Sequence, residues 1–205
     1  MKRARSAERS DSVRNRARVL KAASDLVALY GVGELTMERV AVEAAVGKGT
    51  VFRHFGDRVG LLRALLERSE QRFRDTLSFG PPPVGPGAPA LIRLHAFGCA
   101  ALETATVELE LRIAATGKAD ESFSSDSYTF RRDHLLELLE ELMPEVHGEV
   151  LTHLMLGYFD PARLHYLHLR RGVSLETLDT TWHDILGRMV TRSPADALGA
   201  LPCRS

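Results

Sequence analysis

Apolar residues recur along this chain at spacings of three and four, and no segment shows strict alternation of apolar and polar residues. The first spacing marks one face of an α-helix, and the second would mark a strand. The pattern therefore predicts an all-α protein. Gly31 and Gly33 suit the end of the first helix, because glycine tolerates positive φ. The apolar stripe of that helix consists of Val19, Ala22, Ala23, Leu26, Val27 and Tyr30.

Two short helices are predicted after these glycines. Thr36 can cap the first of them through its hydroxyl, while Leu35 and Val40 can pack together across the cap. The second short helix covers about residues 48–55. Two short helices joined by a tight turn after a longer helix make a helix-turn-helix, whose second short helix enters the DNA major groove.

Longer helices are predicted in the rest of the chain. Asp57 can cap a helix that lasts until GPPPVGPGAPA at residues 80–90, which we expect to be a stiff, exposed connector. Pro161 should kink or break the helix in which it lies. The further helices are expected at about 88–105, 106–116, 127–143, 147–171 and 174–192. We divide the chain into residues 1–58, a helix-turn-helix domain with a basic leader, residues 59–192, a helical effector-binding and dimerisation domain, and residues 193–205, a disordered tail.

Charge separates the same regions. The 205 residues carry no formal net charge, but residues 1–60 hold 12 Lys and Arg against 7 Asp and Glu, and the remainder hold 15 against 20. The N-terminal segment is therefore +5 and the rest −5, which favours a nucleic-acid partner or, alternatively, a solvated basic face. The leader, with Lys2, Arg3, Arg5, Arg9 and Arg14, is interpreted either as an arm along DNA or as a solvated tail.

The second short helix carries side chains suited to DNA. In GKGTVFRHF at residues 47–55, Lys48, Thr50 and Arg53 offer donors to phosphates or base edges. Val46, Val51 and Phe55 have the spacing of a buried face. Gly49 permits close approach of the backbone. His54 is weighed evenly between a DNA contact and a structural histidine between two helices.

Residues 14–66 resemble the DNA-binding region of the TetR family of repressors. The family pattern T-x-x-x-I/V-A-x-x-A-G-V-S-K-G-T-L-Y-R-H-F is followed from Thr36 to Phe55, with agreement at Val40, Ala41, Ala44, Val46, Lys48, Gly49, Thr50, Arg53 and His54. The resemblance implies that family members touch DNA at the positions of Thr36, Lys48, Gly49, Thr50, Phe52, Arg53, His54 and Arg58.

Four departures from the family matter for the expected DNA contacts. Ala45 stands where a turn glycine is usual, and positive φ there would cost about 1 kcal/mol. Gly47 replaces the usual serine and remains an acceptable N-cap. Phe52 replaces tyrosine and cannot donate a hydrogen bond to phosphate. Arg58 replaces lysine and keeps the positive charge.

The resemblance also implies a homodimer and a small-molecule sensor. We expect the last two helices to form the dimer interface, including the stripe of Leu175, Leu178, Trp182, Ile185, Leu186 and Met189. The alternative is that this stripe packs inside the chain. Phe97, Cys99, Tyr128, Phe130 and Arg131 are candidates for lining a pocket for an unidentified effector, against the alternative of ordinary core and surface positions.

No catalytic or cofactor motif is apparent. His165 and His168 have a spacing that could share a metal, but a third converging ligand is not evident, so we predict no metal site and no cofactor. Cys99 and Cys203 are expected to be free thiols in a cytoplasmic protein without a membrane segment.

The predicted function is that of a ligand-responsive repressor, not an enzyme, released from a palindromic double-stranded DNA operator by its effector. The alternatives are a helical-bundle enzyme or ligand carrier, and a ligand-independent DNA-binding protein.

Overall fold

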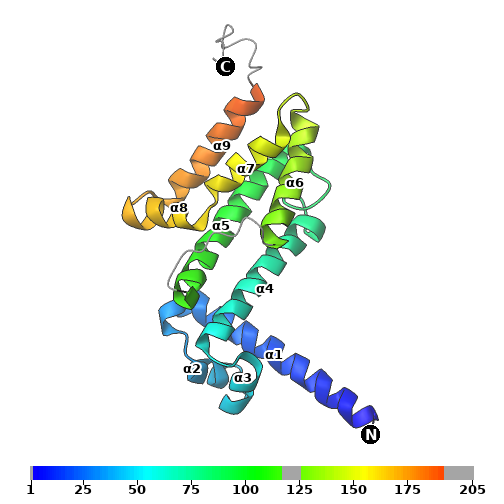
Figure 1. Cartoon of the computed structure of the whole chain (residues 1–205), viewed down its shortest axis with the longest axis vertical. Coiled ribbons are helices and arrows are strands. Elements are labelled where there is room, and N and C mark those ends of the chain that lie inside the picture. Colours follow the sequence, from blue (N-terminus) through cyan, green and yellow to red (C-terminus); the bar gives the residue numbers. More distant parts are fainter. Residues whose placement is uncertain (1, 117–125, 192–205) are drawn as a thin grey trace, which may run out of the picture. The chain divides into compact units, whose positions relative to one another are not determined.

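A computed structural model describes residues 2–116 and 126–191, and these residues form helices and no strand (Figure 1). The expected all-α fold is therefore confirmed. The elements are α1 (Lys2–Tyr30), η1 (Val32–Glu34), α2 (Met37–Glu43), α3 (Lys48–Phe55), α4 (Arg58–Phe79), α5 (Ala90–Thr116), α6 (Asp126–Leu142), α7 (Gly148–Tyr158), α8 (Pro161–His165), the wide single turn η2 (Tyr166–Arg170) and α9 (Leu175–Thr191).

The described residues group into two compact units. Of the described residues, unit 1 comprises 2–72 and 106–116, and unit 2 comprises 73–105 and 126–191. Helices α4 and α5 thus contribute residues to both units. Each unit has its own hydrophobic core, against which its helices pack their apolar faces.

The core of unit 1 is built by the apolar stripe of α1, without Tyr30, which is 57% exposed, together with α2, α3 and the first turns of α4. Val19, Leu35, Val40, Val51 and Leu61 are fully buried there. Leu35 and Val40 therefore pack in one core on either side of the Thr36 cap, as the sequence predicted. Helix α1 begins at Lys2, so the basic leader is helical.

Helix boundaries in unit 2 follow from capping residues and proline. The Asp160 carboxylate accepts a hydrogen bond from the Arg163 amide at 2.8 Å, and Pro161 occupies the first turn of α8, where its missing N–H costs nothing. The predicted break at Pro161 is confirmed. In contrast, the two helices expected at 88–105 and 106–116 form one helix, α5. The tail 193–205 lies outside the described residues.

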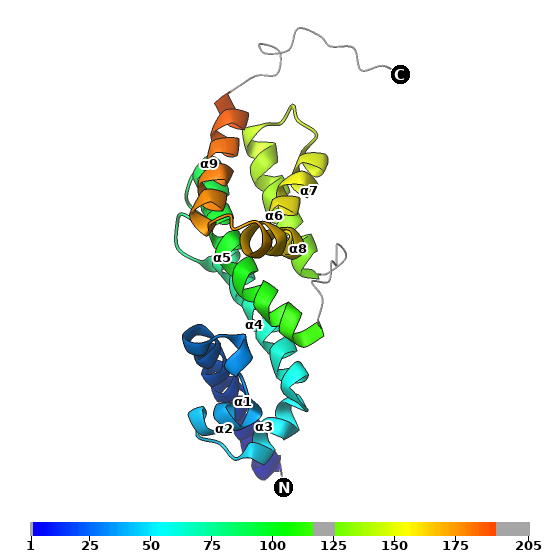
Figure 2. The same cartoon turned by 90° about the vertical axis from the view of Figure 1, so that its left-hand side faces the viewer.

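Helix α9 lies along α5 within unit 2, as both views show (Figure 1, Figure 2). Trp182 of α9 is 2% exposed and contacts the rings of Tyr158 and Phe159, at centroid distances of 5.8 and 4.8 Å. Leu178 and Leu186 are buried in the same core. The expectation that the Trp182 stripe forms a dimer interface is therefore wrong for these three residues, which pack inside their own chain.

None of the helices in the described part of the chain is both long and apolar enough to cross a membrane.

Candidate nucleic-acid interface

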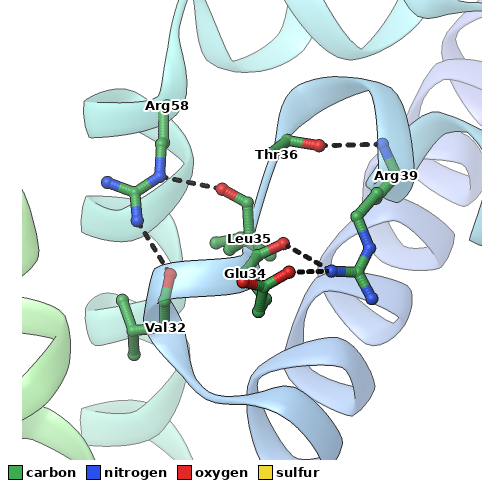
Figure 3. A network of polar contacts seen from close by, with 6 residues as sticks. All are labelled: Val32, Glu34, Leu35, Thr36, Arg39 and Arg58. Atoms are coloured by element: carbon green, nitrogen blue, oxygen red, sulfur yellow. Dashed lines mark hydrogen bonds and ion pairs between the residues drawn. The ribbon is translucent and has the colours of Figure 1, made fainter.

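Helix α2 is fixed at its N-terminal side by a guanidinium group from α4. Arg58 donates from Nε to the Leu35 carbonyl and from Nη2 to the Val32 carbonyl, both at 2.8 Å (Figure 3). The forked donors of arginine suit two carbonyls that lie close together. The Thr36 side chain caps α2 by accepting a hydrogen bond from the Arg39 amide at 3.2 Å, which confirms the predicted cap.

A second arginine ties α2 to the loop before it. Arg39 donates from Nη1 to the Glu34 carbonyl at 3.2 Å and pairs with the Glu34 carboxylate at 2.7 Å (Figure 3). Its guanidinium also lies 4.9 Å from the centroid of the Tyr30 ring. These contacts occupy Arg39 within unit 1.

The turn between α2 and α3 is held by a third arginine. Arg18 of α1 donates from Nη2 to the carbonyls of Ala44 and Ala45, at 2.6 and 3.0 Å. Ala45 has a φ of 49°, so the predicted positive φ at this alanine is confirmed. Because a Cβ atom is strained in this conformation, the turn carries a cost of about 1 kcal/mol that a glycine would not have.

Replacing Ala45 with glycine should therefore raise the free energy of unfolding by about 1 kcal/mol. Ala17, exposed within α1, is the matched control: the same change there places glycine inside a helix and should lower stability by a similar amount. Urea denaturation followed by circular dichroism measures both. A loss of stability in Ala45→Gly would contradict the strain argument.

Helix α3 has one buried and one exposed face. Val51 and Phe55 pack into the core of unit 1, while Lys48, Gly49 and Arg53 are exposed. The predicted division of α3 into two faces is confirmed. Gly47 is the N-cap residue, with extended φ and ψ, as predicted.

The Lys48 side chain has partners on α2 and α3. Its ammonium pairs with the Glu38 carboxylate at 2.5 Å and lies 5.6 Å from the centroid of the Phe52 ring, which is 40% exposed. The hydrogen bond from Lys48 lowers the pKa of Glu38 below its ordinary value. An anion that binds Lys48 therefore competes with Glu38 for its ammonium group.

His54 points partly into unit 1. Its Nε2 atom is buried and has no hydrogen-bond partner among the described residues. Burial lowers the pKa of His54 below its ordinary value, and the charges of Arg53 and Arg16 act in the same direction. The imidazole is therefore favoured in its neutral form, which suits a packing role between α3 and its neighbours.

The eight residues that the resemblance assigned to DNA occupy two places. Lys48, Gly49, Thr50, Phe52, Arg53 and His54 lie on α3, whereas Thr36 and Arg58 support the N-terminal side of α2. Sequence reasoning missed Arg18 and Glu38. The carbonyl partners of Arg18 belong to a turn 26 and 27 residues away, and no spacing rule indicates such a contact.

Three of the five pocket candidates come together in unit 2. Phe97 and Phe130 stack on the ring of His134 at centroid distances of 5.9 and 6.5 Å, and the Arg131 guanidinium lies 4.7 Å from the centroid of Phe73. Phe73 in turn contacts Phe97 at 5.7 Å. Sequence reasoning missed His134 at the centre of this cluster.

The two other candidates lie elsewhere in unit 2. The Tyr128 hydroxyl hydrogen-bonds the His153 ring, and the Cys99 thiol contacts His183.

Comparison with known proteins identifies the N-terminal region. The sequence profile described as "Bacterial regulatory proteins, tetR family" matches residues 19–65. Two HTH-type transcriptional regulators of Staphylococcus aureus strains are similar: one, from strain bovine RF122 / ET3-1, is 35% identical over 65 residues, which are 32% of this chain and 35% of the relative. The other, from strain USA300, is 37% identical over 60 residues, or 29% and 32% of the two chains. The match thus spans about a third of the length of these relatives.

Solved structures extend the likeness in fold to most of the chain. A TetR transcriptional regulator from Streptomyces coelicolor superposes with a TM-score of 0.58 and 20% identity, covering 85% of this chain and 98% of its own. The fatty acid degradation regulator FadR from Bacillus halodurans gives a TM-score of 0.55 and 17% identity, covering 83% and 97%. At these identities the likeness establishes the fold. Residues 19–65 therefore match the TetR family of bacterial regulatory proteins, and most of the chain has a fold similar to that of these solved regulators.

Proposed function

We propose that the protein is a ligand-responsive transcriptional repressor that binds a palindromic DNA operator as a homodimer, through the exposed face of α3. The observation that carries the proposal is the arrangement of this face. It presents Lys48, Gly49 and Arg53 to solvent, while Val51 and Phe55 anchor the helix in the core. A short helix supported in this way fits the major groove.

The side chains of α3 are proposed to have different roles. Arg53 reads base edges, while Lys48 and Thr50 bind phosphates or base edges beside it. Thr36, exposed at the start of α2, is a further candidate for a phosphate contact.

Three of the predicted DNA residues have partners that favour a supporting role. Arg58 holds two carbonyls, His54 directs Nε2 inward, and the Phe52 ring lies beside the Lys48 ammonium. We therefore propose that these three position α3 and Lys48, and that the direct contacts come mainly from the others.

Duplex binding tests this proposal. A preferred duplex, selected from a random pool, should bind about 1000-fold or more tighter than a scrambled one, and log affinity should fall linearly with log salt at about −0.9 per neutralised phosphate. Arg53→Ala should cost about 1–3 kcal/mol on the preferred duplex, whereas Lys48→Ala should weaken both duplexes comparably.

Glu38→Gln should have the opposite effect to Lys48→Ala. It removes the carboxylate that pairs with Lys48, and should therefore strengthen binding to both duplexes. Equal affinity of the unsubstituted protein for the preferred and scrambled duplexes would reject the proposed function.

Gly49 allows stability and DNA binding to be separated. A Cβ atom built at this position meets no atom within 4 Å, so alanine fits the unbound protein and should stabilise α3 by up to about 1 kcal/mol. If the backbone of α3 approaches DNA closely here, Gly49→Ala should still weaken duplex binding. Thermal unfolding and fluorescence anisotropy measure the two effects, and unchanged affinity would exclude close approach at Gly49.

A second copy of the chain is the proposed occupant of apolar surface on α7 and α9. Val150 and Leu154, one helical turn apart on α7, are 54% and 69% exposed, and Ile185 on α9 is 39% exposed. A palindromic operator has two equivalent half-sites, so its recognition requires two copies of the chain. Burying these exposed apolar side chains against the second copy would remove them from water.

Leu154→Glu should shift the dimer toward monomer, because it places a charge in the proposed interface. Leu29→Glu on α1 is the matched control, since Leu29 is 72% exposed in unit 1 and should tolerate the charge. Light scattering at micromolar concentration distinguishes the two states. Equal dimerisation of both variants would place the interface elsewhere.

Unpartnered polar atoms favour an effector site in unit 2. Among the residues that the structure describes, buried His134 Nε2 and Thr152 Oγ1 have no hydrogen-bond partner. Buried polar groups in proteins nearly always have one, so a ligand with polar groups is favoured near them.

An effector that opposes DNA binding with a coupling of about 1–3 kcal/mol would lower the affinity for DNA about 5–150-fold. Bound DNA would lower the affinity for the effector by the same factor. Once a ligand is found by thermal-shift screening, calorimetric titration with and without saturating operator tests this coupling. Equal ligand affinities in the two titrations would exclude it.

A further inference from the structure

Two pairs of metal-binding side chains meet between α5 and α9 in unit 2. His95 and Cys99 are four residues apart on α5, and Asp179 and His183 are four residues apart on α9. This spacing places both members of each pair on one face of their helix. The rings of His95 and His183 stack at a centroid distance of 4.8 Å, which brings the two faces together.

The adjacent residues explain why the two helices come so close. A Cβ atom on Gly98 would lie 1.9 Å from Nε1 of Trp182, so only glycine allows the indole to rest against α5. Cys99 and His183 immediately follow these two residues. The close approach of α5 and α9 at Gly98 thus sets the distance between the thiol and the imidazole.

Three donor atoms lie near one another, and two of their three separations match those of a tetrahedral metal site. His183 Nε2 lies 3.5 Å from Cys99 Sγ and 3.5 Å from Asp179 Oδ2, and donor atoms of the three residues all lie within 4.8 Å of one another. Ligands bound at about 2.0–2.3 Å to a tetrahedral Zn²⁺ ion are separated by roughly 3.3–3.8 Å. Small rotations of Asp179 would bring all three donors to one ion.

His95 is suited to orient His183 rather than to bind the same ion. Its Nδ1 atom lies 2.6 Å from Nδ1 of His183, too short for two ligands of one metal but suitable for a hydrogen bond. If His183 donates this bond from Nδ1, its Nε2 lone pair faces Cys99 and Asp179. A metal-ligating histidine usually has such an outer partner.

We propose that Cys99, Asp179 and His183 bind a divalent transition-metal ion, with Zn²⁺ the best match, and that His95 is a positioning residue for His183. Thiolate, imidazole and carboxylate are each zinc ligands in proteins, and three protein ligands leave the fourth position to water. The three residues are half-buried, so an ion can reach them from solvent.

The alternative of a reactive cysteine fits these surroundings less well. Burial, followed by the hydrogen bond to Asp179, raises the pKa of the Cys99 thiol to about 11. A thiol of this kind is a poor nucleophile at neutral pH, since the thiolate is the reactive form. Metal binding, in contrast, replaces the proton on the sulfur.

Cobalt titration of the full-length, chelator-treated protein tests the proposal. Co²⁺ should produce a thiolate-to-metal charge-transfer band and d–d bands of tetrahedral intensity that saturate at one ion per chain, and Zn²⁺ should abolish them. Cys99→Ser should remove the charge-transfer band, and His183→Gln and Asp179→Asn should weaken binding strongly. His95→Gln should retain the band but lower affinity about 10–100-fold, the effect of losing an outer partner.

Matched variants exclude binding elsewhere and loss of fold. Cys203→Ser removes the only other cysteine of the sequence, and His153→Gln removes a histidine that pairs with Glu149 at the same four-residue spacing on α7. Both should bind Co²⁺ as the unsubstituted protein does. Circular dichroism checks that each variant is folded, and Zn²⁺ should raise the melting temperature of the unsubstituted protein but not of Cys99→Ser.

The proposal is overturned if Co²⁺ gives no charge-transfer band, if the band survives in Cys99→Ser, or if Zn²⁺ raises the melting temperatures of the unsubstituted protein and Cys99→Ser equally. The site is remote in sequence from α3, so its failure would leave the duplex-binding test unaffected.

Discussion

Trp182→Ala is expected to lower the free energy of unfolding by about 3–5 kcal/mol, the usual range for removing a buried aromatic side chain. The indole is almost fully buried among Tyr158 and Phe159 and rests against Gly98. Alanine leaves a cavity at the contact of α5 with α9 that these helices can close only in part.

Ile92→Ala on α5 is the control, because Ile92 is 48% exposed, is not part of the proposed dimer surface and should cost much less. Urea denaturation followed by far-ultraviolet circular dichroism measures both variants. Similar losses for the two variants would mean that Trp182 is not the centre of the unit 2 core.

Acidification should destabilise unit 2 through His134. Burial, followed by the charge of Arg93, lowers the pKa of this histidine to about 4 from an ordinary value of 6.5. Above pH 6.5 the imidazole is neutral in both the folded and the unfolded chain, so it does not affect stability. Between pH 6.5 and 4 the unfolded chain binds a proton that the folded chain excludes, and about 3 kcal/mol of stability is lost.

His134→Phe isolates this contribution, because the ring can still pack between Phe97 and Phe130 but cannot bind a proton. The variant should lose less stability than the unsubstituted protein between pH 7 and pH 4, measured by urea denaturation across that range. Identical pH profiles for the unsubstituted protein and His134→Phe would contradict the assignment.

Features that depend on local chain chemistry were predictable from the sequence. The Thr36 cap, the positive φ of Ala45 and the break at Pro161 each follow from what one residue type does to the backbone nearby. The two faces of α3 follow from spacing. These predictions needed no knowledge of which helix lies against which.

Features that depend on packing between distant helices could not be predicted. An apolar stripe shows which face of a helix is covered but not what covers it, so Trp182 was assigned to a dimer interface although it is buried in its own chain. Likewise, charge did not reveal that Arg58 bonds to backbone carbonyls, or that Lys48 faces Glu38. Cys99 and His183 are 84 residues apart, and only the tertiary fold brings them together.

The arginines on either side of α2 have a consequence for the entropy of association. Arg58 holds the carbonyls before this helix and Arg18 holds those after it, so both ends of α2 are fixed to α4 and α1 before any partner is present. A binding element that is already ordered loses little conformational freedom when it docks. We therefore expect only a small entropic cost of ordering the helix-turn-helix on DNA binding, so that most of the favourable free energy of the α3 contacts contributes to affinity.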